Sequence, residues 1–206
     1  MRYVYPPRPK GRTTPSDLTI FESSGEWLVQ RKYNGVRNLV HKMADGSMCF
    51  FNRHGSEQSK IKPTKVMFDA INSIGFKNGR EYVLDGELLK IGLDNKPIFV
   101  IFDILWDGKY LFGSPSQFER LEILRDLCGG FHLETDYGYK LSNDIFVANY
   151  WMKNFLMEFN RVLDHPKIEG LILRKKHSAL DDYGYREYET TSQVRCRKPV
   201  RDGLNF

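Results

Sequence analysis

Several common signatures are absent from this chain of 206 residues, and each absence excludes a class of protein. The three cysteines, Cys49, Cys128 and Cys196, form no CxxC pair, so we expect neither a disulfide framework nor a zinc site. No stretch reaches the ~18 consecutive apolar residues that a membrane-spanning helix needs. The first 12 residues are basic and rich in proline without an apolar segment, which excludes a signal peptide. Together these absences predict an intracellular protein without a membrane partner.

Familiar catalytic motifs are also missing. The sequence has no glycine-rich Walker loop and no HExxH motif, and its 5 histidines are scattered, which argues against a histidine-based metal site. What it does have is 41% hydrophobic and 14% aromatic residues, enough for one packed core. Its net charge of +5 points to an acidic partner, with nucleic acid or a nucleotide as the first candidates.

Alternation and turn residues predict an α+β fold, in which antiparallel sheets are flanked by helices. The expected strands span residues 27–33, 36–42, 48–53, 82–91, 98–105, 168–174 and 193–197. Helices are expected over residues 63–74 and 147–163, and after Ser116, which forms a capping box with Glu119. The chain is expected to form one domain over residues 1–206, with residues 1–14 as an irregular basic leader.

Lys32 ends the first expected strand, directly before Asn34 and Gly35. Asn-Gly is the strongest short hairpin signal, because a type I′ turn requires positive φ at both central positions, so residues 36–42 are expected to return antiparallel. Alternation places Lys32 and Gln30 on one face of the strand. A lysine is a nucleophile only when it is neutral, and nearby cations favour the neutral form. Taken alone, Lys32 fits a solvated strand-end lysine better than a nucleophile.

Five sequence elements in a fixed order change that interpretation. They are KYNGVR at residues 32–37, NRHG at residues 52–55, LDGEL at residues 84–88, VIFD at residues 100–103 and IEGLI at residues 168–172. In order and spacing they resemble the motifs of the covalent nucleotidyltransferase superfamily, which includes ATP-dependent DNA ligases, RNA ligases and mRNA capping enzymes. The resemblance covers roughly residues 27–199. It implies an ATP-grasp-like nucleotidyltransferase domain, most similar to small ATP-dependent DNA ligases.

The resemblance also implies a role for each motif residue. Lys32 would attack the α-phosphorus of ATP, hold AMP as a phosphoramidate, and pass it to a nucleic-acid 5′-phosphate so that a nick is sealed. Gln30 and Phe102 would contact adenine, the first through its amide and the second by stacking. Glu87 would accept a hydrogen bond from the ribose, and Glu87 and Glu169 would bind Mg²⁺ or Mn²⁺ through carboxylate oxygens. The cations expected at the ribose and phosphates are Arg37, Arg53, Arg195, Arg197 and Lys198.

Two positions depart from the family pattern. Asn34 replaces the usual aspartate, which removes one charge but keeps a side chain that suits a turn. The last motif is usually Lys-x-Lys but here includes Arg195 and Arg197, which share a strand face, whereas Lys198 needs a local irregularity to join them. The sequence leaves open which of these three cations contacts the phosphates.

Other functions are also compatible with the motifs. An RNA ligase would use the same pocket on nicked RNA, a capping guanylyltransferase would use GTP, and a non-catalytic relic would bind a nucleotide or nucleic acid. The OB-fold domain that follows in DNA ligases and capping enzymes is not expected within these 206 residues, so a missing segment or a separate partner would supply it. The basic leader is interpreted either as a surface strap or as a contact to a phosphate backbone.

Overall fold

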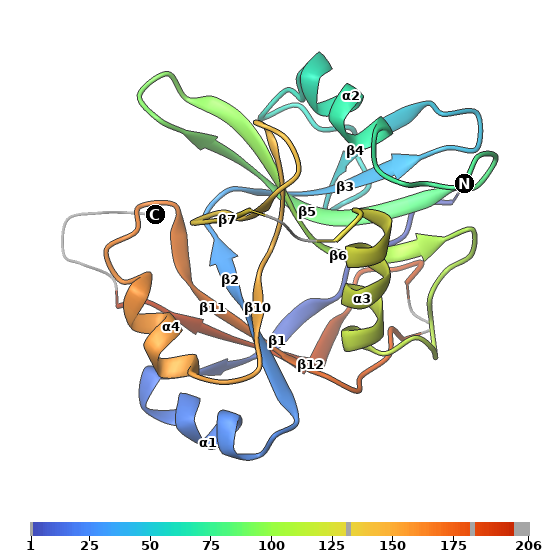
Figure 1. The fold of residues 1–206 in the computed structure, drawn as a ribbon. Helices are drawn as coiled ribbons and strands as arrows, with labels where there is room; N and C mark the ends of the chain where they lie inside the picture. Colours follow the sequence, from blue (N-terminus) through green and yellow to red (C-terminus); the bar gives the residue numbers. More distant parts are fainter. Residues whose placement is uncertain (1, 131–132, 182–183, 200–206) are drawn as a thin grey trace.

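The computed structural model describes residues 2–130, 133–181 and 184–199, which form two sheets with helices packed against them (Figure 1). The first sheet has the strand order β1-β12-β11-β2-β10, with bounds Arg8–Thr13, Glu189–Arg197, Ile168–Lys175, Trp27–Tyr33 and Tyr150–Trp151. The second has the order β4-β3-β5-β6-β9-β8-β7, with bounds Met48–Asn52, Val36–Lys42, Tyr82–Ile91, Lys96–Asp107, Ile145–Val147, Gly138–Lys140 and Glu134–Thr135. The helices are α1 (Leu18–Ser23), α2 (Lys65–Asn72), α3 (Gln117–Leu127) and α4 (Phe155–Arg161), with a 3₁₀ turn, η1, at Pro15–Asp17. The expected α+β fold is confirmed.

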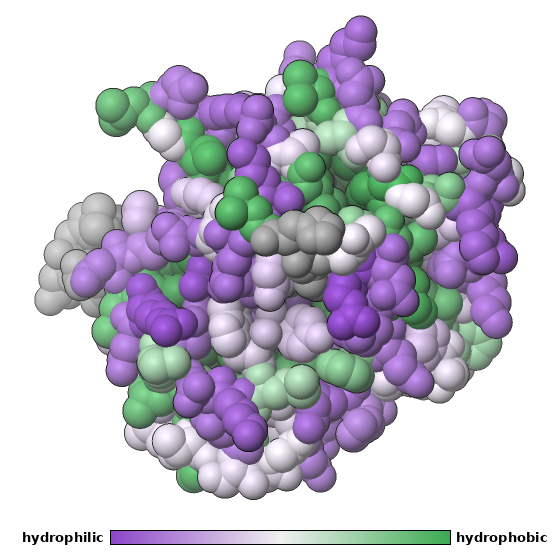
Figure 2. Space-filling model, in the orientation of Figure 1, coloured by the Kyte–Doolittle hydropathy of each residue, from purple (hydrophilic) through white to green (hydrophobic). Residues whose placement is uncertain are grey.

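Each sheet buries one face against its own helices. Leu18 of α1 and Phe155 of α4 pack into the core of the first sheet, and Met67 of α2 and Leu124 of α3 into that of the second. A third cluster joins the two sheets through Tyr33, Ile168, Val100 and Phe146. On the face drawn in Figure 2, apolar residues appear in separate spots among hydrophilic ones, as expected when the apolar surface is used internally. None of the helices in the described ranges has the length and apolar character to cross a membrane.

Local sequence signals fixed several element boundaries. Strand β5 has the expected bounds, and β6 and β11 extend only slightly beyond theirs. Helix α3 begins with the expected capping box: the Ser116 amide donates to Glu119 Oε2 at 2.7 Å, and the Glu119 amide donates to Ser116 Oγ at 3.4 Å. The box pairs two backbone amides that the helix itself leaves free, so the sequence alone locates this helix start.

The predicted hairpin at Asn34-Gly35 is wrong, because the chain crosses from one sheet to the other at this point. Strand β2 belongs to the first sheet, and β3 pairs with β4 and β5 in the second. Gly35 does not have a positive φ, but a Cβ added there would lie 2.3 Å from the carbonyl oxygen of Leu88. Glycine is therefore needed here because the backbone of Leu88 approaches it closely, and not because of a type I′ turn. The crossing makes Lys32 and Arg37 project from different sheets.

Three further expectations need correction. Residues Arg8–Thr13 are not an irregular leader but form β1, which pairs with β12 in parallel. The helix expected over residues 147–163 is too long. Its first part contains the end of β9 and all of β10, and α4 begins only after Asn154, which has φ +63°. Short apolar runs fit a strand as well as a helix, and here sheet pairing decided between them. Each sheet also contains one parallel pair, β1–β12 or β6–β9, so neither is purely antiparallel.

Candidate active site

A pocket of about 590 Å³ lies between the two sheets, and it brings together nearly all the residues expected from the sequence. From the first sheet the lining residues include Gln30, Lys32, Glu169, Arg195 and Arg197. From the second sheet and the turn after β4 they include Arg37, Arg53, Glu87 and Phe102. Lys198 does not line the pocket: its ammonium donates to the carbonyl oxygens of Val162 at 3.0 Å and His165 at 2.7 Å. The structure therefore separates Lys198 from Arg195 and Arg197.

Lys32 has a carboxylate as its partner inside the pocket. Its Nζ donates to Glu169 Oε2 at 2.5 Å, and the same oxygen lies 3.5 Å from Arg197 Nε. The pairing of β11 is irregular between Ile168 and Gly170, which includes Glu169, and Gly170 lies between Lys32 on β2 and Arg197 on β12. Gly170 has φ +139°, and a Cβ added there would meet the backbone of Cys196 and Arg197, so glycine is needed at this irregular step.

Glu87 faces this ion pair from the second sheet. It is the register partner of Arg37, and its Oε1 accepts a hydrogen bond from the Gly35 amide at 3.2 Å. Burial raises the pKa of Glu87 to about 7; the charges of Lys32 and Arg37 oppose the rise, and the charge of Glu169 adds to it. A bound cation would offset both burial and carboxylate repulsion at this position.

Arg37 is held in place by Asp85, a residue to which the sequence assigned no role. Arg37 Nε lies 2.9 Å from Asp85 Oδ1, Nη2 lies 2.5 Å from Oδ2, and Nη1 donates to the carbonyl oxygen of Pro7 at 2.8 Å. The Asp85 side chain is fully buried, so this bidentate pair satisfies a charge that would otherwise be costly. The Arg37 guanidinium also lies 5.5 Å from the centroid of the Phe102 ring.

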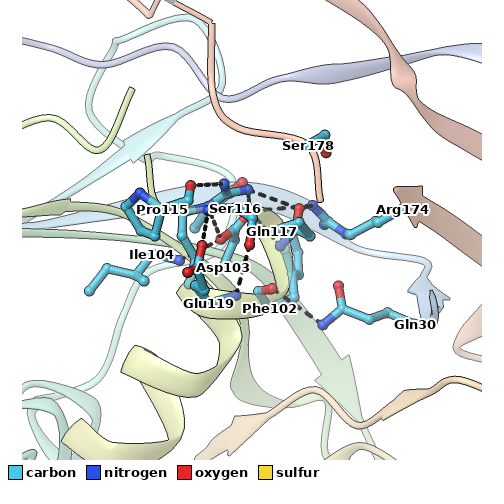
Figure 3. A network of polar contacts seen from close by, with 12 residues as sticks. Gln30, Phe102, Asp103, Ile104, Pro115, Ser116, Gln117, Glu119, Arg174 and Ser178 are labelled. Atoms are coloured by element: carbon cyan, nitrogen blue, oxygen red, sulfur yellow. Dashed lines mark hydrogen bonds and ion pairs between the residues drawn. The ribbon is translucent and has the colours of Figure 1, made fainter. Parts of the chain in front are cut away.

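A second buried carboxylate, Asp103, directly follows the pocket residue Phe102 and is the centre of a network of polar contacts (Figure 3). Arg120 of α3 donates to both its oxygens, at 2.9 and 3.1 Å, and Gln117 donates to Oδ2 at 3.2 Å. Arg174 of β11 lies 3.4 Å from the same oxygen and places its guanidinium 5.3 Å from the Phe102 ring centroid. Burial alone would raise the pKa of Asp103, but the two guanidiniums outweigh it and hold the pKa below its usual value. The network therefore ties α3 and β11 to the strand that carries Phe102.

Gln30 and Phe102 are connected through the backbone. Gln30 is nearly fully buried, and its Nε2 donates to the carbonyl oxygen of Phe102 at 3.3 Å (Figure 3). The contact joins β2 of the first sheet to β6 of the second, so the two residues expected at adenine are held together by the fold. Phe102 lines the pocket, and its stacking on adenine stays a prediction.

Arg53 lies at the rim of the pocket in a chain of polar contacts. Its Nε donates to His54 Nε2 at 3.0 Å, and His54 Nδ1 lies 2.6 Å from Glu187 Oε1. Glu187 also pairs with Arg8 of β1 at 3.0 Å. These contacts connect the turn after β4 in the second sheet to the segment before β12 and to β1 in the first sheet.

The sequence reasoning missed Asp85, Asp103, Arg174 and the His54–Glu187 contact. A usable signal existed for the two aspartates, because each is a charged residue in the middle of a largely apolar strand. Buried carboxylates are rare unless they are paired, so such a position predicts a cationic partner. Which arginine supplies that partner depends on contacts between residues 17 to 71 positions apart, which no local pattern contains.

A protein-family model matches part of the chain. Residues 12–97 match the family model described as the ATP dependent DNA ligase domain. Over 58 residues the chain is 34% identical to DNA ligase 6 of Arabidopsis thaliana, a segment that makes up 28% of this chain and 4% of the plant protein. The chain is therefore related to only a small part of that ligase.

Solved structures extend the likeness to the whole fold. The ligase domain of LigD from M. tuberculosis superposes with a TM-score of 0.65 at 19% identity, covering 93% of this chain and 58% of that one. The ATP-dependent DNA ligase of bacteriophage T7, in complex with ATP, gives a TM-score of 0.58 at 12% identity, covering 91% of this chain and 67% of that one. The chain therefore shares the fold of these ligase domains, and its residues 12–97 match the family model of the ATP dependent DNA ligase domain.

Proposed function

We propose that the chain uses Lys32 to accept AMP from ATP and passes it to the 5′-phosphate of a nicked DNA strand. The observation that carries this proposal is the position of Lys32: its Nζ lies inside the pocket, bonded to Glu169, with Glu87 and Arg37 on the facing sheet. A solvated lysine at the end of a strand would not have these charged neighbours. The pocket also has guanidiniums for phosphates and an aromatic ring for a base.

The proposed transfer has three steps. In the first, the neutral Lys32 amine attacks the α-phosphorus, the new N–P bond forms, the bond to the leaving pyrophosphate breaks, and the nitrogen loses one proton to solvent. In the second, a 5′-phosphate oxygen attacks the same phosphorus, the N–P bond breaks, and the Lys32 nitrogen takes up a proton from solvent to become an amine again. In the third, a 3′-hydroxyl oxygen attacks the 5′-phosphorus and loses its proton to solvent, the phosphodiester bond forms, and the bond from that phosphorus to the leaving AMP breaks. The P–N bond keeps the phosphate activated between steps, which is the reason for a covalent intermediate.

Among the cations, Arg195 and Arg197 are the proposed phosphate ligands, because both line the pocket and Lys198 is bound elsewhere by two carbonyl oxygens. Arg53 is proposed to contact the ribose or a phosphate, which requires it to leave His54. Gln30 and Phe102 are proposed to hold the adenine. Arginine binds phosphate through two parallel hydrogen bonds, so the change from lysine to arginine keeps the function of this strand.

The residues present fit a Mg²⁺ or Mn²⁺ ion at Glu87 and Glu169. Both carboxylates line one pocket; burial is the main cause of the raised pKa of Glu87, and the negative charge of Glu169 adds to it. In the described part of the chain no group of three or more histidine, cysteine, aspartate or glutamate side chains forms a complete cage. Mg²⁺ commonly needs only one or two carboxylates, because substrate phosphates and water complete its shell. When bound, it would neutralise charge on the leaving pyrophosphate.

Incubation with α-³²P-labelled ATP and Mg²⁺, followed by denaturing electrophoresis, tests the first step. A labelled protein band is expected for the parent chain and none for Lys32→Ala. Lys90→Ala is the matched control, since Lys90 is an exposed lysine on β5 outside the pocket, and it should label like the parent. A parent chain that stays unlabelled, or a label that survives Lys32→Ala, would contradict the proposal.

Parallel reactions separate the alternative substrates. Labelling by GTP in place of ATP would indicate a capping guanylyltransferase, and chase of the label onto nicked RNA in preference to nicked DNA would indicate an RNA ligase. The chain spans 58% of the M. tuberculosis ligase domain and 4% of the plant ligase. The transfer of label to nicked nucleic acid is therefore also measured with a separately supplied OB-fold domain. Release of label to nicked DNA is the expected result.

A further inference from the structure

Strand β1 brings an additional arginine to the phosphate end of the first sheet. The parallel register pairs Arg12 of β1 with Arg195 of β12, and Arg195 in turn lies opposite Ile172 of β11. Paired residues on neighbouring strands point to the same side of a sheet, at a spacing of about 4.8 Å. Arg195 lines the pocket, so Arg12 emerges on the same side, one strand farther from Lys32.

Three guanidiniums therefore gather at one corner of the sheet: Arg12, Arg195 and Arg197. Arg195 and Arg197 share a face of β12, and Arg12 lies beside Arg195. Burial lowers the pKa of Arg195, and the charges of Arg12 and Arg197 lower it further against the opposing charge of Glu189. The Nε of Arg195 is buried and has no hydrogen-bond partner among the described residues. Like charges in contact are unfavourable unless an anion joins them.

Strand β1 carries a second arginine, Arg8, which lines the pocket and already has a carboxylate partner. Arg8 has a carboxylate partner, Glu187, at 3.0 Å, whereas Arg197 reaches the Glu169 oxygen only at 3.5 Å. Arg12 is exposed at the edge of the sheet, where it can meet a ligand that extends out of the pocket. The geometry is that of a row of cations leading away from Lys32 toward the sheet edge.

We propose that Arg12, Arg195 and Arg197 form a phosphate-binding row that continues the pocket, and that β1 belongs to the substrate-binding surface through Arg12. This proposal concerns the same site as the proposed function. It rests on that function only for the identity of the phosphate that is bound. Two sources supply the same oxyanion chemistry: the terminal phosphates of the nucleotide, and the backbone of the acceptor strand.

Two binding titrations, neither of which requires catalysis, test this proposal. Each compares the parent chain with the variants Arg12→Gln and Arg12→Lys. One titrates inorganic tripolyphosphate, and the other titrates a nicked DNA duplex without nucleotide over a range of salt concentrations. Arg12→Gln is expected to weaken at least one of the two by on the order of tenfold, and Arg12→Lys to restore part of the loss. Lys90→Gln removes an exposed charge from β5 and is the matched control for net charge.

The pattern of loss identifies the phosphate. Weaker tripolyphosphate binding alone assigns the row to the nucleotide, and weaker duplex binding with a salt slope smaller by about 1 assigns it to the acceptor backbone. Binding of both ligands equal to that of Lys90→Gln, with an unchanged melting temperature, would overturn the proposal. A parent chain that binds through Arg12 but forms no ATP adduct would instead leave the row intact and contradict the proposed function.

Discussion

Lys32 Nζ and Glu169 Oε2 lie 2.5 Å apart, so the proposed nucleophile and a proposed metal ligand are each other's partners. A cation that bound Glu169, as proposed, would compete with Lys32 for the same carboxylate oxygen. Glu87 lines the same pocket from the second sheet and is the other proposed metal ligand.

Glu169→Gln is expected to slow adduct formation by on the order of 100-fold, a loss typical of a group that stabilises charge in the transition state. The amide cannot supply the negative charge that a divalent cation needs. Single-turnover labelling with α-³²P-labelled ATP measures the rate. Glu26→Gln alters an exposed glutamate and is the control. A rate for Glu169→Gln within a factor of two of the Glu26→Gln rate would remove Glu169 from the mechanism.

Asp103→Asn is expected to lower the free energy of unfolding by ~3–5 kcal/mol, because it leaves the buried guanidiniums of Arg120 and Arg174 without a carboxylate. Urea denaturation followed by circular dichroism measures the change. Asp69→Asn on the exposed side of α2 should change it by less than about 0.5 kcal/mol. Equal stability of the two variants would mean that the network in Figure 3 does not hold the sheets together.

Gly35→Ala is expected to cost at least ~3 kcal/mol and to disturb Lys32, because the new Cβ would meet the Leu88 carbonyl oxygen at 2.3 Å, a backbone atom that cannot rotate away. Gly46→Ala in the β3–β4 turn is the comparison: Gly46 has φ +87° and open space around it, so about 1–2 kcal/mol of strain is expected. Melting temperature and ATP labelling are measured for both. A smaller loss in Gly35→Ala than in Gly46→Ala would favour a simple turn over a crossing between sheets.

His41 should make stability depend on pH. Burial lowers its pKa to about 4, from an ordinary value near ~6.5 in the unfolded chain. Between these values the unfolded state binds more protons, so the free energy of unfolding falls as the pH drops from about 6.5 to about 4. His41→Phe keeps an aromatic ring against Tyr3 and Phe51 and removes the titration. The difference in unfolding free energy between pH 7 and pH 5 should then be smaller in the variant; an identical difference would exclude His41 as its source.

The sequence by itself predicted much of the local structure and a set of candidate site residues. Strand patterns located β5, β6 and β11, the Ser116–Glu119 pair located the start of α3, and the order of the motifs brought Lys32, Glu87 and Glu169 into one hypothesis. These signals are local, because they depend on side-chain periodicity and on hydrogen bonds within one turn of backbone.

Only the tertiary structure decided which strands pair and which charges meet. After Gly35, β3 pairs with β5 instead of forming the hairpin that Asn-Gly favours. Strand β1 pairs with β12, which lies more than 175 residues farther along the chain. The partners of Asp85 and Asp103 were equally undetermined, since a buried charge requires a partner but does not specify which residue supplies it. Pairing between distant strands depends on packing over whole sheet faces, and a local pattern contains no information about the opposing face.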